Sequence, residues 1–135
     1  MTGDNIKNNT REEMARGDHT LTAAETLIAS KFYNDAVSRA YYAMLYYARA
    51  LLLTKGLEAK SHYGTYQLLN LHFIKDGHLA AVHGSNFAHV QSYRELSDYE
   101  ATTVFDEAQA RQEIETARKF MAACRELVKK ACSDL

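Results

Sequence analysis

The segment 34–56 constrains the fold more than any other part of the chain, because its apolar residues occur on nearly every face of the helix that it predicts. Asn34 or Asp35 is expected to cap this helix and Gly56 to end it. One stripe of larger residues contains Val37, Tyr41, Met44, Leu45, Ala48 and Leu52. A second, narrow stripe consists mostly of alanine, which lets another helix approach closely. A helix that is apolar all round needs neighbours on several sides. The segment therefore predicts the central helix of a bundle.

Capping signals place another helix before this segment. Thr10 opens a Thr-Arg-Glu-Glu capping box, which predicts a helix from there to Ser30. Gly17 weakens the early part of that helix, so a start nearer Asp18 is the alternative. Residues 1–9 are polar, so we expect a flexible N-terminus followed by a single helical domain over 10–135.

Three more helices are expected in the second half of the chain. Their predicted starts are Ser61, Ser85 or Asn86, and Asp106. The first stops at Gly77, the second ends near Tyr99, and the third has apolar residues that step by four and three over 110–131. No strand-like alternation occurs, and the absence of proline favours long helices. The predicted fold class is all-α, an up-and-down bundle of four to five helices.

The charge and cysteine content narrow the classes of function. The net charge is −1, from 16 basic and 17 acidic residues, so any contact with nucleic acid must come from a local patch. Cys124 and Cys132 would lie about 12 Å apart along one helix, too far to pair. We expect reduced thiols and a cytoplasmic protein. The polar N-terminus does not resemble a signal peptide, and no apolar run is long enough to span a membrane.

The sequence predicts neither a bound metal nor a cofactor. Six histidines are present, but neither Glu-x-x-His pairs nor a His-Glu-x-x-His motif occurs. The six glycines are scattered and form no phosphate-binding loop.

One polar cluster lies on the predicted central helix. Arg39, Tyr42, Tyr46 and Arg49 are spaced by three, four and three residues, so they share one face. This face is either half-buried, with arginine stems packed on tyrosine rings, or a groove for nucleotides. In the second case the rings stack on bases and the guanidinium groups bind phosphate.

A second polar cluster lies at the end of the fourth predicted helix. It contains Tyr93, Arg94, Asp98 and Tyr99. Arg94 and Asp98 are four residues apart and can form a surface ion pair within the helix. Alternatively, Arg94 is directed at an anionic ligand or partner.

A third candidate is the Lys60-Ser61-His62 segment that follows the central helix. His62 is either an ordinary residue at a helix N-terminus or, together with Lys60, part of an anion-binding loop beside the arginine-rich face.

The sequence YNDAVSRAYYA at 33–43 resembles the second-helix signature of the HEPN family. Gly56, the Lys60-Ser61-His62 segment, and Arg94 with Asp98-Tyr99 fit the same pattern in order. The resemblance covers roughly 18–128 and implies an all-α bundle.

The resemblance also implies a function. HEPN proteins often occur beside minimal nucleotidyltransferases, many of them in toxin–antitoxin pairs. Many are metal-independent ribonucleases whose motif, Arg followed after four to six residues by His, is brought together across a homodimer. Arg94 matches the motif arginine, but Tyr99 stands where the shortest spacing places histidine. With a pKa near 10, tyrosine is a poor base at pH 7.

Three functions are therefore open. The first is a HEPN protein that binds nucleotide or RNA and acts with a nucleotidyltransferase-type partner in a toxin–antitoxin-like or stress-related regulatory role. The second is an active, metal-independent ribonuclease toxin, and the third is a helical interaction module that does not bind nucleic acid. The candidate catalytic residues are Arg94, Tyr99 and His62. The candidate nucleotide- or RNA-binding residues are Arg39, Tyr42, Tyr46, Arg49, Lys60 and Asp98. A homodimer is expected from the family pattern.

Overall fold

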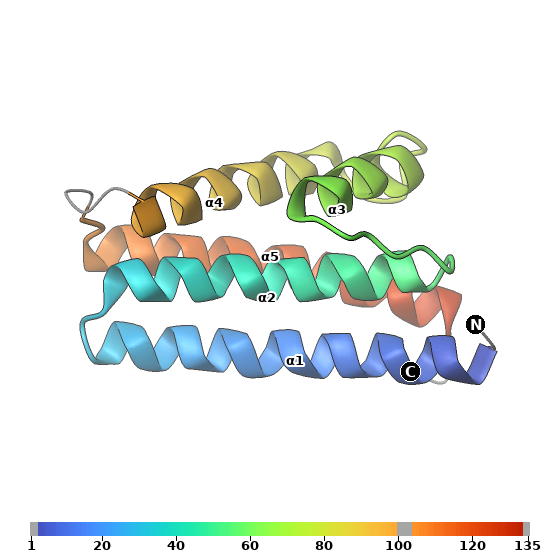
Figure 1. The fold of residues 1–135 in the computed structure, drawn as a ribbon, viewed down its shortest axis with the longest axis horizontal. Helices are drawn as coiled ribbons and strands as arrows, with labels where there is room; N and C mark the ends of the chain where they lie inside the picture. The colour runs from blue at the N-terminus through green and yellow to red at the C-terminus, as the bar shows by residue number, and fades with distance from the viewer. Residues whose placement is uncertain (1–2, 100–103, 134–135) are drawn as a thin grey trace.

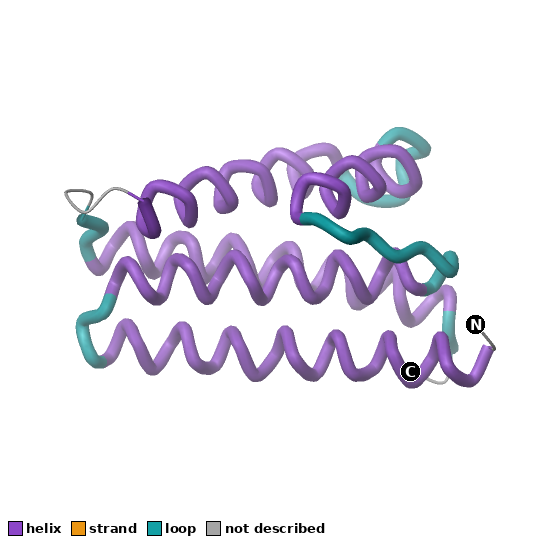
Figure 2. Tube along the Cα trace, viewed as in Figure 1, coloured by secondary structure: helices purple, strands orange, loops and turns teal. Residues whose placement is uncertain are grey.

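The helices of this protein are seen in a computed structural model that describes residues 3–99 and 104–133, with 96–99 described by their backbone only. The helices are α1 (Gly3–Ala29), α2 (Tyr33–Leu53), α3 (His62–Leu69), α4 (Ala81–Tyr99) and α5 (Glu107–Ala131). A π-helical turn, η1 (Asn70–Ile74), continues α3. The described residues contain no strand (Figure 2). The predicted all-α bundle is confirmed.

Helix α2 is the centre of the bundle. It contacts α1, α3, α4 and α5, with α1 on one side and α3 and α4 on the other (Figure 1). All five of its alanines and all four of its leucines are buried. This burial on several sides is what its sequence pattern predicts.

The core forms where apolar side chains of the outer helices meet α2. Leu21 and Ile28 come from α1, and Val128 comes from α5. Phe87 of α4 and Phe120 of α5 are fully buried, and their ring centroids are 5.3 Å apart. Burial of large aromatic side chains is strongly stabilising, so this contact helps to fix α4 against α5.

Two predicted capping residues act as the sequence indicates. The Ser61 side chain accepts a hydrogen bond from the Gly64 N–H at 2.8 Å and caps α3. Asp106 caps α5 through a complete capping box with Gln109. Such caps satisfy backbone donors that would otherwise lack a partner, so both helix starts are fixed by local sequence.

The predicted start of α1 is wrong. The helix begins at Gly3 rather than Thr10, and Thr10 is fully buried within it. The capping-box pattern is therefore not used, because the helical backbone continues through it and the threonine packs against the core instead.

The predicted starts of α2 and α4 also differ from the structure. The residue that precedes α2 is Phe32, which makes no side-chain cap, and the Asn34 side chain instead accepts a hydrogen bond from the Phe105 N–H at 2.9 Å. Helix α4 begins at Ala81, before Ser85 or Asn86. Leu79 is buried and its N–H bonds to the Phe73 carbonyl at 2.8 Å, so the chain is anchored just ahead of the helix.

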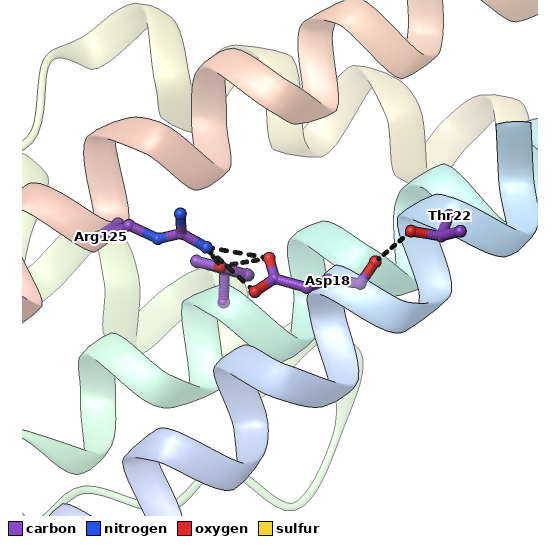
Figure 3. A network of polar contacts seen from close by, with 4 residues as sticks. Asp18, Thr22 and Arg125 are labelled. Atoms are coloured by element: carbon purple, nitrogen blue, oxygen red, sulfur yellow. Dashed lines mark hydrogen bonds and ion pairs between the residues drawn. The ribbon is translucent and has the colours of Figure 1, made fainter. Parts of the chain in front are cut away.

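A polar network joins α1, α2 and α5 (Figure 3). The buried Tyr47 hydroxyl donates to Asp18 Oδ1 at 2.5 Å and accepts from the Arg125 guanidinium, which also donates to Asp18 Oδ1 at 3.0 Å. Gly17 lies beside it, and a Cβ at this position would be 2.6 Å from Tyr47 Cδ2. The glycine is therefore needed for the close approach of the tyrosine ring.

Cys124 and Cys132 are both buried and are not bonded to each other. Within the described ranges, none of the helices combines the length and apolar character needed to cross a membrane.

Candidate functional site

The contacts of Arg94 connect α4 with α2. Its guanidinium carbon lies 5.5 Å from the ring centroid of Tyr41 and 5.7 Å from that of Tyr42. Arg94 Nη1 also donates to the Tyr42 hydroxyl at 3.4 Å. These are distances at which a guanidinium group is attracted to aromatic rings. Arg94, from the predicted cluster at the end of α4, therefore contacts Tyr42, from the predicted cluster on α2.

Arg39 reaches the same tyrosine from α2. Its guanidinium carbon is 4.8 Å from the ring centroid of Tyr42, and the side chain is exposed. Two guanidinium groups from different helices, Arg39 and Arg94, thus lie against one ring. The sequence placed both arginines in candidate sites, and the structure brings them together.

His62 joins this group from α3. The connection 54–61 runs back along α2 before α3 begins (Figure 2), which places the first residue of α3 beside the middle of α2. The imidazole centroid is 5.5 Å from that of Tyr41 and 5.8 Å from that of Tyr42. Because Ser61 caps the helix, the position of His62 is fixed.

The surroundings of His62 favour its neutral form. Burial lowers the pKa of the imidazole, and the positive charges of Arg94 and Arg49 lower it further, against an opposing contribution from Glu95. A neutral imidazole has a free nitrogen lone pair and can accept a proton. His62 therefore has the electrostatic character of a general base at neutral pH.

Tyr41 belongs to the site, although sequence reasoning missed it. Its ring is fully buried, and its hydroxyl has no hydrogen-bond partner in the described part of the chain. Burial raises the pKa of the hydroxyl, so the group stays protonated and can donate. Because the spacing of Tyr41 matches the apolar stripe of α2, the sequence pattern gives no sign that its hydroxyl belongs to a site. The name arginine–tyrosine site is used below for Arg39, Tyr41, Tyr42, His62 and Arg94.

Arg49 lies further along α2, near the opposite end from Arg39. It is half-buried and lines a cleft of about 380 Å³ with residues of α1 and of the segment after α2, including Glu13 and Glu58. Its charge acts on both His62 and Tyr41. Arg49 therefore contributes to the electrostatics of the arginine–tyrosine site through its charge.

Tyr46 contacts an arginine of α1, whereas the predicted groove requires it to lie with the arginines of α2. The guanidinium group of Arg16, on α1, lies 5.5 Å from its ring centroid. The four-residue face of α2 is consequently divided: Tyr42 contacts Arg94 of α4, whereas Tyr46 contacts Arg16 of α1. Helical spacing shows which residues share a face, but not which helix covers each part of it.

The remaining predicted residues lie at the edge of the site or outside the description. Lys60 is exposed and lines a groove beside α3. The side chains of Asp98 and Tyr99 lie outside the described residues, so the structure assigns them no position. Over the described ranges, His, Cys, Asp and Glu side chains form no group of three that could hold a metal ion.

The arrangement has the chemistry of a phosphate site. Guanidinium groups bind phosphate oxygens through paired hydrogen bonds, tyrosine rings stack on bases, and a neutral imidazole can accept a proton from a hydroxyl. All three kinds of group lie within one cluster formed by α2, α3 and α4.

Comparison with known proteins identifies the family. Residues 10–127 match the sequence model of the HEPN domain. A protein of Methanocaldococcus jannaschii whose name describes it as a proposed toxin is 35% identical over 118 residues, which are 87% of this chain and 84% of that protein. A protein of Thermotoga maritima named as a UPF0332 protein is 31% identical over 113 residues, 84% of this chain and 86% of its own length. The chain belongs to the HEPN domain family, and the resemblance seen in its sequence is confirmed.

Proposed function

We propose that this protein is a toxin-like HEPN protein that binds RNA at the arginine–tyrosine site. One observation carries the proposal: the guanidinium groups of Arg39 and Arg94, from different helices, lie against the ring of Tyr42. The name of the M. jannaschii relative supports the toxin-like role. The net charge of −1 adds no general attraction for RNA, so this local pair of cations must supply it.

The proposal includes a partner and a second copy of the chain. HEPN proteins often occur beside minimal nucleotidyltransferases, and we propose that such a protein regulates this one. We also propose a homodimer, because a two-fold axis would place two arginine–tyrosine sites side by side and double the cationic surface offered to one RNA.

RNA binding tests the proposal. The affinity for a fluorescein-labelled single-stranded RNA is measured by fluorescence anisotropy at low and moderate salt. We expect Arg94→Ala and Arg39→Ala each to weaken binding about tenfold or more, the range for losing a hydrogen bond to a charged group. Binding should also weaken steeply with salt.

Arg111→Ala is the matched control. Arg111 is an exposed arginine of α5 that pairs with Glu107 at 2.9 Å and lines the seam between α1 and α5. Its loss should leave RNA affinity unchanged, and circular dichroism should show that all variants are folded. Equal affinity of wild type, Arg94→Ala and Arg39→Ala would reject the proposal.

A second function, metal-independent cleavage of RNA, is favoured by the position of His62. The imidazole is held in its neutral form beside Tyr41 and Tyr42, whose rings the Arg94 guanidinium also contacts. It could take the proton of a 2′-hydroxyl, whose oxygen then attacks the adjacent phosphorus while the 5′-oxygen leaves and is protonated by water. Arg94 would stabilise the negative charge that develops on the phosphate oxygens. Here a histidine on α3 would take the place of the motif histidine that α4 lacks.

Cleavage is tested by incubating the protein with transfer RNA in EDTA. Wild type should cut, and His62→Gln should lower the rate by about a hundredfold or more, the contribution of general base catalysis, while it weakens RNA binding less than Arg94→Ala does. If wild type leaves the RNA intact although it binds, RNA binding stands alone as the function. Growth arrest on expression, relieved by a co-expressed nucleotidyltransferase partner, would support the toxin-like role under either chemistry.

A further inference from the structure

A groove runs along the outer face of α3 and η1, beside the arginine–tyrosine site. Its volume is about 660 Å³. Tyr63, Gln67 and Leu71 line it at intervals of four residues, so they form one stripe about 12 Å long. Tyr63 is 64% exposed and Leu71 is 53% exposed. An exposed tyrosine ring and an exposed leucine in one groove form a surface that a ligand can cover.

The charges at the groove favour an anionic occupant. Lys60 lies before the stripe and Lys75 after it, and both line the groove. Neither ammonium group has an ion-pair partner within the described ranges, whereas Lys55 nearby pairs with Asp76 at 3.9 Å. Glu58 is the single carboxylate of the lining. Two unpaired cations against one carboxylate give the groove a positive charge.

The groove begins on the helix that also carries His62. Tyr63 follows His62 directly, and His62 faces Tyr41 and Tyr42 while Tyr63 faces solvent. Side chains of neighbouring residues on a helix point about 100° apart. A strand bound at Arg94 and His62 therefore has to pass from one face of α3 to another to reach the Tyr63 ring, and only an RNA longer than a dinucleotide is expected to do so.

We propose that this groove, formed by Lys60, Tyr63, Gln67, Leu71 and Lys75, is a subsite for single-stranded RNA. The proposal rests on the proposed function and extends it. The Tyr63 ring stacks on one base, the Gln67 amide bonds to a base edge, and the two lysines bind flanking phosphates. The occupant is single-stranded because the faces of paired bases are not open to an aromatic side chain.

The test compares two lengths of RNA, a labelled ten-nucleotide oligouridine and a labelled uridine dinucleotide. We expect Tyr63→Ala to weaken binding of the longer RNA about fivefold to a hundredfold, the range for losing one stacked base. Tyr63→Phe is the matched control and should keep wild-type affinity, because it keeps the ring. The dinucleotide should bind both variants as it binds wild type, because it fills only the arginine–tyrosine site.

A second measurement tests the lysines. Lys60→Ala combined with Lys75→Ala should reduce the salt dependence of binding to the longer RNA by about 1.4 in the slope of log K against log salt, the value for two phosphate contacts to a single strand. Lys119→Ala, on the exposed face of α5, is the control and should leave the slope unchanged.

The possible failures can be told apart. If Arg94→Ala loses binding while Tyr63→Ala binds the longer RNA like wild type, the subsite is rejected and the proposed function stands. If no variant alters RNA binding, both are rejected. If Tyr63→Ala changes the oligomeric state in sedimentation but not RNA affinity, the groove is a protein interface, and the RNA subsite is rejected.

Discussion

At the scale of single residues, His62 shows that the surroundings of a side chain determine which protonation state is favoured. The sequence offers an ordinary histidine at a helix start, whereas the fold places it against Tyr41 and Tyr42 and near two guanidinium groups. Burial and these positive charges both disfavour the imidazolium ion. The result is a histidine suited to accept a proton beside the arginines that we propose bind RNA.

The pKa of His62 can be measured directly. The imidazole signals followed by NMR should titrate with a midpoint below 6.5, the ordinary value for histidine. Arg49→Gln should raise the midpoint, because it removes a positive charge that opposes protonation. Arg111→Gln, near the start of α5, should leave it in place, because Arg111 is not among the charges that act on His62. A midpoint at or above 6.5 in the wild type would show that the site does not favour the neutral form.

Sequence reasoning identified several residues of the site and missed one. Arg39 and Tyr42 are candidates because their helical spacing puts them on one face of an otherwise apolar helix. His62 is a candidate from the Lys60-Ser61-His62 segment, and Arg94 is one because it matches the motif arginine. Tyr41 was assigned to the apolar stripe, since periodicity reports where a side chain points and not whether its hydroxyl finds a partner.

At the scale of elements, Gly17 shows that a residue of low helix propensity can be required for the packing of two helices. From sequence, a glycine in α1 only weakens the helix. In the structure it lets the Tyr47 ring approach, so that the Tyr47 hydroxyl can join Asp18 and Arg125 (Figure 3). The glycine thus has a packing role that outweighs its helix propensity, and nothing local in the sequence reveals it.

Substitution of this glycine tests the packing role. Gly17→Ala should lower the free energy of unfolding by about 1 kcal/mol, because overpacking costs about 1–3 kcal/mol and exceeds the gain in helix propensity. Gly3→Ala is the matched control, since a Cβ there meets nothing within 4 Å. Urea denaturation measures both. If Gly17→Ala were as stable as wild type or more so, the close approach to Tyr47 would not limit this position.

The starts of α3 and α5 could be predicted because Ser61 and Asp106 carry complete local signals. The start of α1 could not, since the capping pattern at Thr10 lies within a longer helix. Where tertiary packing extends a helix, a local cap signal is overridden.

At the scale of the whole molecule, the apolar segment 34–56 was sufficient to predict the fold class. A helix buried on several sides requires at least three neighbours, and α1, α4 and α5 provide them. The return of the 54–61 connection along α2, which places His62 in the site, has no sequence signal of its own. For this reason the sequence does not predict that α2, α3 and α4 meet at one site.

The proposed homodimer is tested by sedimentation equilibrium. We expect a dimer at micromolar concentration, because the proposed function pairs two arginine–tyrosine sites across a two-fold axis. RNA affinity measured above and below the dissociation range should then fall as the dimer separates. A monomer throughout this range would count against the paired sites.

The most direct test of the central claim is an NMR titration of the protein with a ten-nucleotide single-stranded RNA. The imidazole signals of His62 in the arginine–tyrosine site are compared with those of His19, an exposed residue of α1. The account predicts that RNA shifts the His62 signals at saturating concentration and leaves those of His19 in place. RNA that binds while the His62 signals stay unchanged would contradict it.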